Sequence, residues 1–269
     1  MSPIRVLYVA SEIAPFLRTS TTAKLVNKLG LAMQEKGIEI RILVPRFGVI
    51  NERKNRLHEV VRLSGMNIMV GSEERALTVK VASIPGSRCQ VYFIDNEDYF
   101  HRKAVFADEK NNFFQDNDER LIFFCKGALA TVKNLEWAPD VVHCHDWMTS
   151  LVPLYLKTAY QHDPILQQAK ALYTIYNNVF SEKLAKNFAE KAKMIGMEDD
   201  SLKSLAAAGL GELTQTGMQH ADAVVRSEVL DKNPLKEFLK EEDIPYIADD
   251  EQGIAAYYEL YTQLAGVKR

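Results

Sequence analysis

The chain has 269 residues, of which 47% are hydrophobic and 26% charged, and its formal net charge is −3. Enough apolar side chains are present to bury a core, which excludes a predominantly disordered chain. The near balance of 33 basic and 36 acidic residues argues against nucleic-acid binding driven by bulk charge. No apolar run reaches the ~18 residues of a membrane span, and no signal-peptide pattern opens the sequence. We expect a cytoplasmic protein without nucleic-acid or membrane partners, whose three unpatterned cysteines, Cys89, Cys125 and Cys144, are reduced thiols.

An alternation of strands and helices opens the chain. The compact β-rich run 4–10 predicts a buried parallel strand. Apolar residues at helical spacing then predict a helix that ends at Gly37, and the run 38–44 predicts a second strand. This strand–helix–strand unit is typical of an α/β sheet with right-handed crossovers. Three strand-like segments follow without intervening helices, and we interpret them as an antiparallel excursion: 67–70, 76–84 and 89–94.

The alternation resumes in the second half of the chain. The pattern predicts these elements: helix 117–133, strand 141–144, helix 149–160, strand 171–175, a helical stretch over 181–220 and a short strand at 224–225. Acidic clusters then indicate a solvated linker. An amphipathic helix closes the chain, with one apolar stripe formed by Ile254, Tyr258, Tyr261 and Leu264. We expect one doubly wound α/β domain over 1–230, a linker over 231–253 and a helix over 254–269 that packs back on the domain.

The loop after the first strand lacks the glycines of a phosphate-binding turn. Ligands of open α/β sheets bind at the carboxyl ends of strands, where a dinucleotide-binding fold places a glycine-rich turn. The first glycine is Gly30, inside the predicted helix, which excludes an ordinary Rossmann fingerprint and a Walker loop. Ser20, Thr21 and Thr22 instead predict a helix N-cap. Arg18 is a cation that a phosphate could meet, although an exposed loop arginine is commonly only solvated.

The next informative strand end carries a cluster of polar side chains. His143 and His145 alternate with Cys144, so both histidines share one face, and Asp146 begins the exit loop. Two alternatives stay open. The histidines are hydrogen-bonded core residues, or they and Asp146 bind hydroxyl groups while Trp147 offers an apolar ring face. A metal site is the weaker hypothesis, because two ligands without a third partner nearby make a poor site. We expect neither a metal nor a cofactor.

A third strand end offers amide side chains. Asn177 and Asn178 both donate and accept hydrogen bonds, which suits sugar hydroxyls. Asparagine also tolerates turn conformations, and local sequence favours that simpler interpretation. No Ser-His-Asp pattern or nucleophile elbow is present. The pairs Phe113-Phe114 and Phe123-Phe124 fit core positions better than a binding platform.

Several segments of the first 225 residues together carry a family resemblance. Val6-Leu-Tyr-Val-Ala-Ser-Glu-Ile-Ala-Pro15 resembles a V-A-S-E-x-A-P signature, and the most specific match is Pro139-Asp-Val-Val-His-Cys-His-Asp-Trp147. Further matches are 95–100 (D-N-x-x-Y-F), 116–124 (D-N-x-x-R-F-x-F-F), 151–157, 174–177 and 221–224. The family is that of the bacterial glycogen and plant starch synthases, glycosyltransferase family 5, in its N-terminal catalytic domain.

The resemblance implies a two-lobed fold in which ADP-glucose binds between two Rossmann-like domains and a glucosyl unit passes to an α-1,4-glucan. Such a transfer needs cations beside the leaving diphosphate and an oriented acceptor. By carry-over onto matching positions, Arg18 would contact the donor, and Asp146 and Tyr176 are the catalytic candidates. Five residues would bind the acceptor, an α-glucan or maltooligosaccharide: Glu12, His145, Asp146, Trp147 and Asn177.

Other motif positions depart from the family's pattern. The family's K-T-G-G-L-A-D loop falls on Arg18-Thr-Ser-Thr-Thr-Ala-Lys24, where both glycines are replaced and the acidic position becomes Lys24. The last histidine of H-D-W-H is Met148, the histidine of T-I-H-N is Tyr176, and Gln215 stands where a lysine is expected. Because a Cβ obstructs the approach of backbone to a diphosphate, these changes disfavour ADP-glucose as a ligand.

The length of the chain bears on the second lobe. About forty residues follow Val229, too few for another Rossmann lobe, while 255–264 resembles the family's last helix, which crosses back onto the first lobe. We therefore expect the acidic linker over 231–253 to replace the second lobe. The expected protein is a glycogen synthase homologue that is inactive alone and binds a glucan, a sugar or a protein partner. The alternative is a glucosyltransferase subunit completed by another chain that supplies the donor-binding lobe.

Overall fold

A nine-stranded mixed sheet forms the centre of the computed structural model, which describes residues 3–177, 179–206, 208–227, 235, 239 and 243–266. The strand order is β3-β5-β6-β2-β1-β7-β8-β9, and β4 pairs with β5. The strands are β1 (Arg5–Ala10), β2 (Glu39–Pro45), β3 (His58–Glu59), β4 (Met66–Val70), β5 (Glu73–Ser83), β6 (Gln90–Asp95), β7 (Val141–His145), β8 (Lys170–Ile175) and β9 (Ala223–Arg226).

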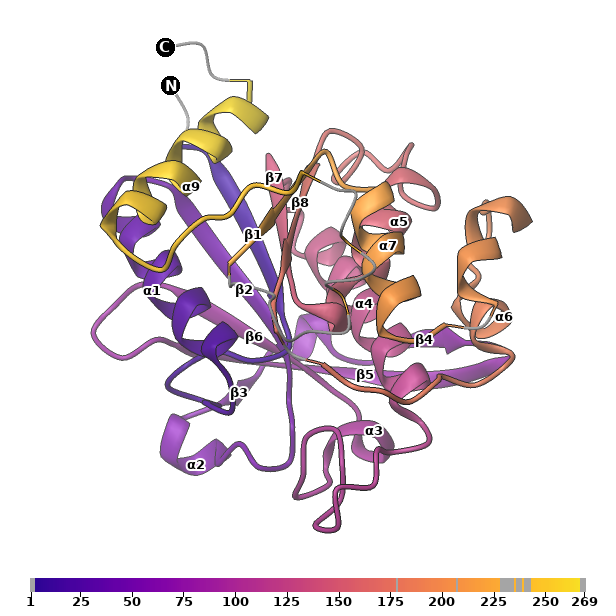
Figure 1. Ribbon diagram of the computed structural model, residues 1–269. Coiled ribbons are helices and arrows are strands. Elements are labelled where there is room, and N and C mark those ends of the chain that lie inside the picture. Colours follow the sequence, from indigo (N-terminus) through magenta and orange to yellow (C-terminus); the bar gives the residue numbers. More distant parts are fainter. Residues whose placement is uncertain are drawn as a thin grey trace.

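Helices cover both faces of the sheet. In Figure 1, α1 and α9 lie together on one side, while α4, α5 and α7 lie on the other. No helix in the described ranges is long and apolar enough to cross a membrane. The helices are α1 (Thr21–Glu35), α2 (Glu52–Asn55), α3 (Glu97–Phe100), α4 (Asn117–Asn134), α5 (Leu151–Lys157), α6 (Phe188–Ala192), α7 (Leu210–Gln219) and α9 (Glu251–Leu264), with 3-10 turns η1 (Val61–Leu63), η2 (Trp147–Thr149) and η3 (Asp199–Leu205).

The strand directions confirm the predicted α/β fold. Strands β6, β2, β1, β7, β8 and β9 run parallel. Strand β5 is antiparallel to β3, β4 and β6, so the predicted antiparallel excursion exists but is narrower than expected. The segment at 90–95 belongs to the parallel core, because a strand that follows an antiparallel hairpin returns to the original direction.

The order of the strands places a candidate site at the carboxyl ends of β1 and β7. From β1 the chain winds outward through β2 in one direction, and after β7 it winds outward through β8 and β9 in the other. Both central strands are buried along almost their whole length, as expected for parallel strands covered on two faces. The reversal between them is the topological switch point at which open α/β sheets bind ligands.

Two of the predicted helices are shorter than their patterns indicated. The segment expected to be one helix over 149–160 forms η2 and α5, because Thr158 (φ −119°, ψ −86°) leaves the helical region. The stretch expected to be helical over 181–220 breaks into α6, η3 and α7. Lys193 is extended (ψ 142°) and Gly196 is left-handed (φ 87°). Here tertiary packing overrides the high helix propensity of Ala, Lys and Glu.

The last helix, α9, lies over the domain beside α1. Its N-cap is Asp250, whose side chain accepts a 2.8 Å hydrogen bond from the Gly253 amide. All four residues of the predicted stripe contact the core: Tyr261 is buried, and Ile254, Tyr258 and Leu264 are half-buried and pack against it. The prediction missed Tyr257, which is buried as well. Tyr257 and Tyr261 are four residues apart, and side chains at this spacing lie on the same face of a helix. Most of the linker predicted over 231–253 lies outside the described residues, which include only 235, 239 and 243–253 of it.

Candidate functional site

The sheet register gathers the predicted site at one end of three adjacent strands. Ala10 of β1 pairs with His145 of β7, which pairs in turn with Thr174 of β8. The residues that follow these strands therefore lie together at the switch point. Of the predicted site residues, four besides His145 are buried and two are exposed: Glu12, Asp146, Trp147 and Tyr176 are buried, and Arg18 and Asn177 are exposed.

Asp146 is held in place by the loop that follows β1. Its carboxylate accepts hydrogen bonds from the Ser11 hydroxyl, from the Ser11 amide at 3.3 Å and from the Met148 amide at 2.9 Å. Its backbone (φ 69°, ψ 178°) lies in a region that is nearly specific to glycine, at a cost of about 1–3 kcal/mol. A backbone strained in this way at a switch point marks Asp146 as a positioned residue.

Burial dominates the electrostatics of Asp146. Desolvation raises the pKa of its carboxyl to about 7, with a smaller contribution in the same direction from the charge of Glu12. The hydrogen bonds from Ser11 and Met148 act against this shift, because they stabilise the ionised form. The carboxyl therefore holds its proton over part of the pH range in which an ordinary aspartate is ionised.

Glu12 closes the loop between β1 and α1. Its carboxylate accepts hydrogen bonds from the Thr19 amide at 2.7 Å and from the Thr19 hydroxyl at 2.9 Å. Ser20 is the N-cap of α1, as predicted, although its side chain makes no capping hydrogen bond. Arg18 and Lys24 are exposed on the same segment. The loop thus turns its carboxylate inward and its basic side chains outward.

The two histidines lie side by side on the face that α9 covers, with ring centroids 3.8 Å apart. His143 is bonded at both nitrogens, to the Tyr261 hydroxyl at 2.6 Å and to the Thr174 hydroxyl at 2.7 Å. His145 contacts the Tyr176 hydroxyl through Nδ1 at 2.7 Å. Its Nε2 is buried and has no hydrogen-bond partner within the described part of the chain. His143 is thus a satisfied core histidine, the first of the two alternatives.

Burial keeps both imidazoles neutral. It lowers the pKa of His143 well below its usual value, helped by the neighbouring His145, and lowers the pKa of His145 to about 3. Tyr8 joins the cluster by accepting a 3.0 Å hydrogen bond from the Tyr261 hydroxyl. A neutral His143 that carries its proton on Nδ1 satisfies this whole chain of contacts. Among the described residues, no three His, Cys, Asp or Glu side chains are grouped so as to hold a metal ion.

Trp147 borders an aromatic groove of about 400 Å³. Its ring lies 4.9 Å from that of Phe106 and 4.8 Å from that of Phe180, while Phe113 stacks on Phe180 at 5.0 Å. Phe113, interpreted from the sequence as a core residue, is half-buried: it packs against the core and also lines this groove. The remaining lining residues are Ala107, Asn111, Val179, Ser181 and Glu182.

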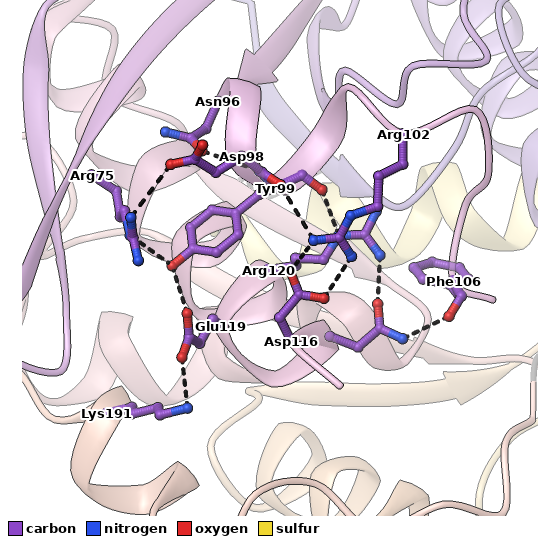
Figure 2. Close-up of polar contacts among 11 residues, drawn as sticks. Arg75, Asn96, Asp98, Tyr99, Arg102, Phe106, Asp116, Glu119, Arg120 and Lys191 are labelled. Atoms are coloured by element: carbon purple, nitrogen blue, oxygen red, sulfur yellow. Dashed lines mark hydrogen bonds and ion pairs between the residues drawn. The ribbon is translucent and has the colours of Figure 1, made fainter. Parts of the chain in front are cut away.

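The loop that carries Phe106 is anchored by the two D-N segments of the sequence, which meet in Figure 2. The buried guanidinium of Arg120 donates to the Tyr99 carbonyl at 2.7 Å and to the Asn117 side chain. Asn117 donates in turn to the Phe106 carbonyl at 2.8 Å. Arg102 pairs with Asp116 on the outer side. The family motifs at 95–100 and 116–124 therefore shape one wall of the groove.

A second branch of the network fixes the ring of Tyr99. The Tyr99 hydroxyl accepts from Arg75 at 3.2 Å and donates to Glu119 at 2.9 Å, and Lys191 pairs with Glu119 at 2.7 Å (Figure 2). Burial lowers the pKa of Arg120 to about 10. This guanidinium lies over the rings of Phe47, Phe100 and Phe114 at 5.3–5.5 Å, which compensates part of its desolvation.

Several residues of the site were not assigned a role by sequence reasoning. Ser11 lies inside the V-A-S-E segment, and its place in that family motif was the one sequence signal that could have indicated a role for it. Thr174 and Tyr8 occupy strand positions whose sequence pattern is that of ordinary core residues, and Phe180 belongs to no recognised motif. Only their spatial neighbours give them a function, which local sequence does not encode.

Comparison with known proteins now decides the family. The starch synthase catalytic domain family matches residues 5–230 of the chain. The chain belongs to this family. Glycogen synthase of Chlorobium luteolum is 38% identical over 235 residues, covering 84% of this chain and 48% of that protein. Glycogen synthase of Pelodictyon phaeoclathratiforme is 41% identical over 174 residues, covering 64% of this chain and 36% of that protein.

A solved structure agrees with the family at the level of the fold. The catalytic domain of starch synthase IV from Arabidopsis thaliana, bound to ADP and acarbose, matches with a TM-score of 0.71 at 18% sequence identity. The match covers 92% of this chain and 51% of that one. The chain thus spans about half the length of the curated relatives it matches. Relative to the family's pattern, the changed position Tyr176 is buried against His145, and Lys24 is exposed.

Proposed function

We propose that this member of the starch synthase family binds an α-glucan in the aromatic groove beside Trp147 and does not transfer glucose by itself. The groove is the observation that carries the proposal. Four aromatic side chains line it, Phe106, Phe113, Trp147 and Phe180, and polar groups stand at Asn111, Ser181 and Glu182. Concave apolar walls with a few polar groups are the usual form of a ligand site. Aromatic faces suit the C–H faces of a sugar ring, and the polar groups suit its hydroxyls.

The contacts at the strand ends support the second half of the proposal. Asp146 already accepts from Ser11 and Met148, and the hydroxyl of Tyr176 is bonded to His145. Both side chains are buried, so a sugar would have to displace internal hydrogen bonds to reach them. A catalytic group must lie within hydrogen-bond reach of the reacting atoms. These two positions, the catalytic candidates of the sequence, are therefore engaged elsewhere.

The glucan half of the proposal is tested by tryptophan fluorescence. The chain has two tryptophans, and Trp137 is bonded to Glu39 at the other end of β7, so a W137F variant reports on Trp147 alone. Titration of this variant with maltoheptaose should change its emission in a saturable manner. F113L in the same background should weaken binding at least tenfold. Y246L removes a ring outside the groove and serves as the matched control. Saturable binding that F113L leaves unchanged would place the glucan elsewhere.

The catalytic half is tested separately, by the release of ADP from ADP-glucose in the presence of glycogen. The chain alone should give no release above background. Turnover by the purified chain would overturn this half of the proposal without affecting the binding result.

One observation favours a second candidate, a glucosyltransferase subunit completed by another chain. Arg18 is exposed in the loop before α1, whose first turn carries no acidic residue, so a cation and the positive end of a helix lie close together in the sequence. This candidate predicts that a second polypeptide copurifies from native lysate and restores ADP release, and that R18A lowers the restored rate. Absence of such a polypeptide removes its support.

A further inference from the structure

A separate groove of about 550 Å³ lies at the sheet edge where α2, β3 and the turn between β5 and β6 meet. In Figure 1, α2 and β3 occupy the lower left of the molecule. Its lining has no acidic residue and three basic ones: Lys54, Arg56 and His58. The other lining residues are Phe16, Asn55, Val81, Ala82, Ser83, Pro85 and Gln90.

These three basic side chains have no acidic partner among the described residues, whereas some exposed lysines elsewhere do. Lys157 pairs with Asp222 at 2.6 Å, and Lys183 with Glu212 at 2.9 Å. Glu52, the acidic residue of α2, is already engaged by Lys80 at 2.7 Å and by Arg46. Like charges that converge without a counter-ion repel one another. The groove is therefore suited to an anion.

Arg56 is placed there at a cost to the backbone. It is the C-cap of α2 and has left-handed dihedral angles (φ 53°, ψ 45°). Glycine or asparagine is the usual residue at such a position, because a Cβ costs about 1 kcal/mol or more in this conformation. The positive charge suits the C-terminus of a helix, and the side chain extends from there into the lining of the groove.

The rest of the lining indicates what accompanies the negative charge. Phe16, Val81 and Pro85 provide apolar surface, while Asn55, Ser83 and Gln90 provide polar groups. A groove of this volume accommodates a small molecule. Inorganic phosphate would leave most of it empty.

We propose that this groove binds a small phosphomonoester of the sugar-phosphate class. The phosphate lies among Lys54, Arg56 and His58, and the hydroxylated body lies against Phe16. No lining residue is shared with the aromatic groove beside Trp147, so the proposal does not depend on glucan binding. Phe16 belongs to the loop between β1 and α1. The same loop carries Ser11, which contacts Asp146 at the strand ends.

Calorimetric titration of the full chain at low ionic strength tests the site with three probes: ribose 5-phosphate, ribose and inorganic phosphate. Ribose 5-phosphate should bind saturably, ribose should give no heat, and phosphate should bind at least tenfold more weakly. Added salt should weaken the binding, because the groove is open to solvent. No saturable heat with ribose 5-phosphate would overturn the site. Equal affinity for phosphate would overturn the sugar-phosphate assignment, and equal affinity for ribose would overturn the role of the charges.

Three variants connect the binding to the basic side chains. R56G relieves the left-handed strain, so it should raise the melting temperature while raising Kd for ribose 5-phosphate at least tenfold. K54Q should also raise Kd and should leave folding intact, since Lys54 is exposed. R53Q removes an exposed charge of α2 that does not line the groove and should leave Kd within twofold. Wild-type affinity in both R56G and K54Q would show that the ligand binds elsewhere.

Discussion

The Tyr261 hydroxyl of α9 lies 2.6 Å from Nδ1 of His143 on β7, a contact between residues 118 positions apart. The same hydroxyl donates to Tyr8 on β1. Through one side chain, the last described helix is tied to the two central strands of the sheet. Because all three groups are buried, none of these hydrogen bonds can be replaced by bulk water without opening the structure.

Removing this hydroxyl should destabilise the fold. Y261F leaves both His143 and Tyr8 short of a partner in a buried site, which costs about 1–3 kcal/mol of unfolding free energy. Urea denaturation measures the loss. Y258F, on the same helix at a half-buried position, is the matched control and should stay within about 0.5 kcal/mol of wild type. Equal effects of the two variants would contradict the role assigned to the network.

The buried histidines should make the protein sensitive to acid. Below about pH 6.5 the unfolded chain binds protons at His143 and His145 that the native state, with lowered pKa values, does not bind. Above about pH 6.5 neither histidine lowers the free energy of unfolding. As the pH falls below about 6.5, each histidine lowers it by about 1.4 kcal/mol per pH unit until its native-state pKa is reached. Asp146 acts in the opposite sense. With its pKa raised to about 7, its native state holds the extra proton between about pH 4 and 7.

These opposed contributions can be separated with D146N, which cannot titrate. Relative to wild type, D146N should lose stability more steeply as pH falls from 6.5 to 4, by about 1.4 kcal/mol per pH unit. Chemical denaturation at a series of pH values gives the difference, in which the surface groups common to both proteins cancel. A difference that does not vary with pH would show that the carboxyl of Asp146 titrates normally.

Replacing glycine by alanine at two helical positions should change the stability of the fold in opposite directions. A Cβ at Gly217 of α7 would lie 2.8 Å from the ring of Tyr173, closer than real contacts allow, whereas a Cβ at Gly30 of α1 has its nearest neighbour, Ile42, at 3.4 Å. G30A should therefore stabilise the protein by up to about 1 kcal/mol through helix propensity. G217A should destabilise it by about 1–3 kcal/mol through overpacking. Thermal unfolding of both variants decides the matter.

Replacing Arg120 by lysine should destabilise the fold, although the positive charge is kept. R120K cannot reach the Tyr99 carbonyl and the Asn117 side chain together, so it should cost about 2–3 kcal/mol. R102K, at a half-buried pair with Asp116 near the surface, is the control and should cost less than about 1 kcal/mol. Because Asn117 supports the loop at Phe106, R120K should also weaken maltoheptaose binding. Unchanged stability of R120K would contradict the anchoring role of this guanidinium.

The sequence predicted the sheet well where one signal dominated. Buried strands such as 4–10 and 141–144 have continuous apolar composition, and the helix at 117–133 has a clear period, so their structures matched within a residue or two. The prediction was incomplete at Tyr257, which is buried beside the predicted stripe, and it was wrong over 181–220, where packing interrupts a stretch of high helix propensity. The family motifs placed the strand ends correctly, but they did not reveal which side chains face inward.

What the sequence determined by itself is the α/β fold, the position of the strand ends and the family, because apolar periodicity and motif spacing are local properties of the chain. The tertiary structure decided which polar side chains are already hydrogen-bonded within the protein. Asp146 meets Ser11 across 135 positions, and the aromatic groove joins Phe113 to Phe180. Such contacts depend on strand register and on burial, which change hydrogen-bonding partners and pKa values without leaving a local trace in the sequence. Length and composition bounded the size of the core, and only the fold showed which polar groups that core encloses.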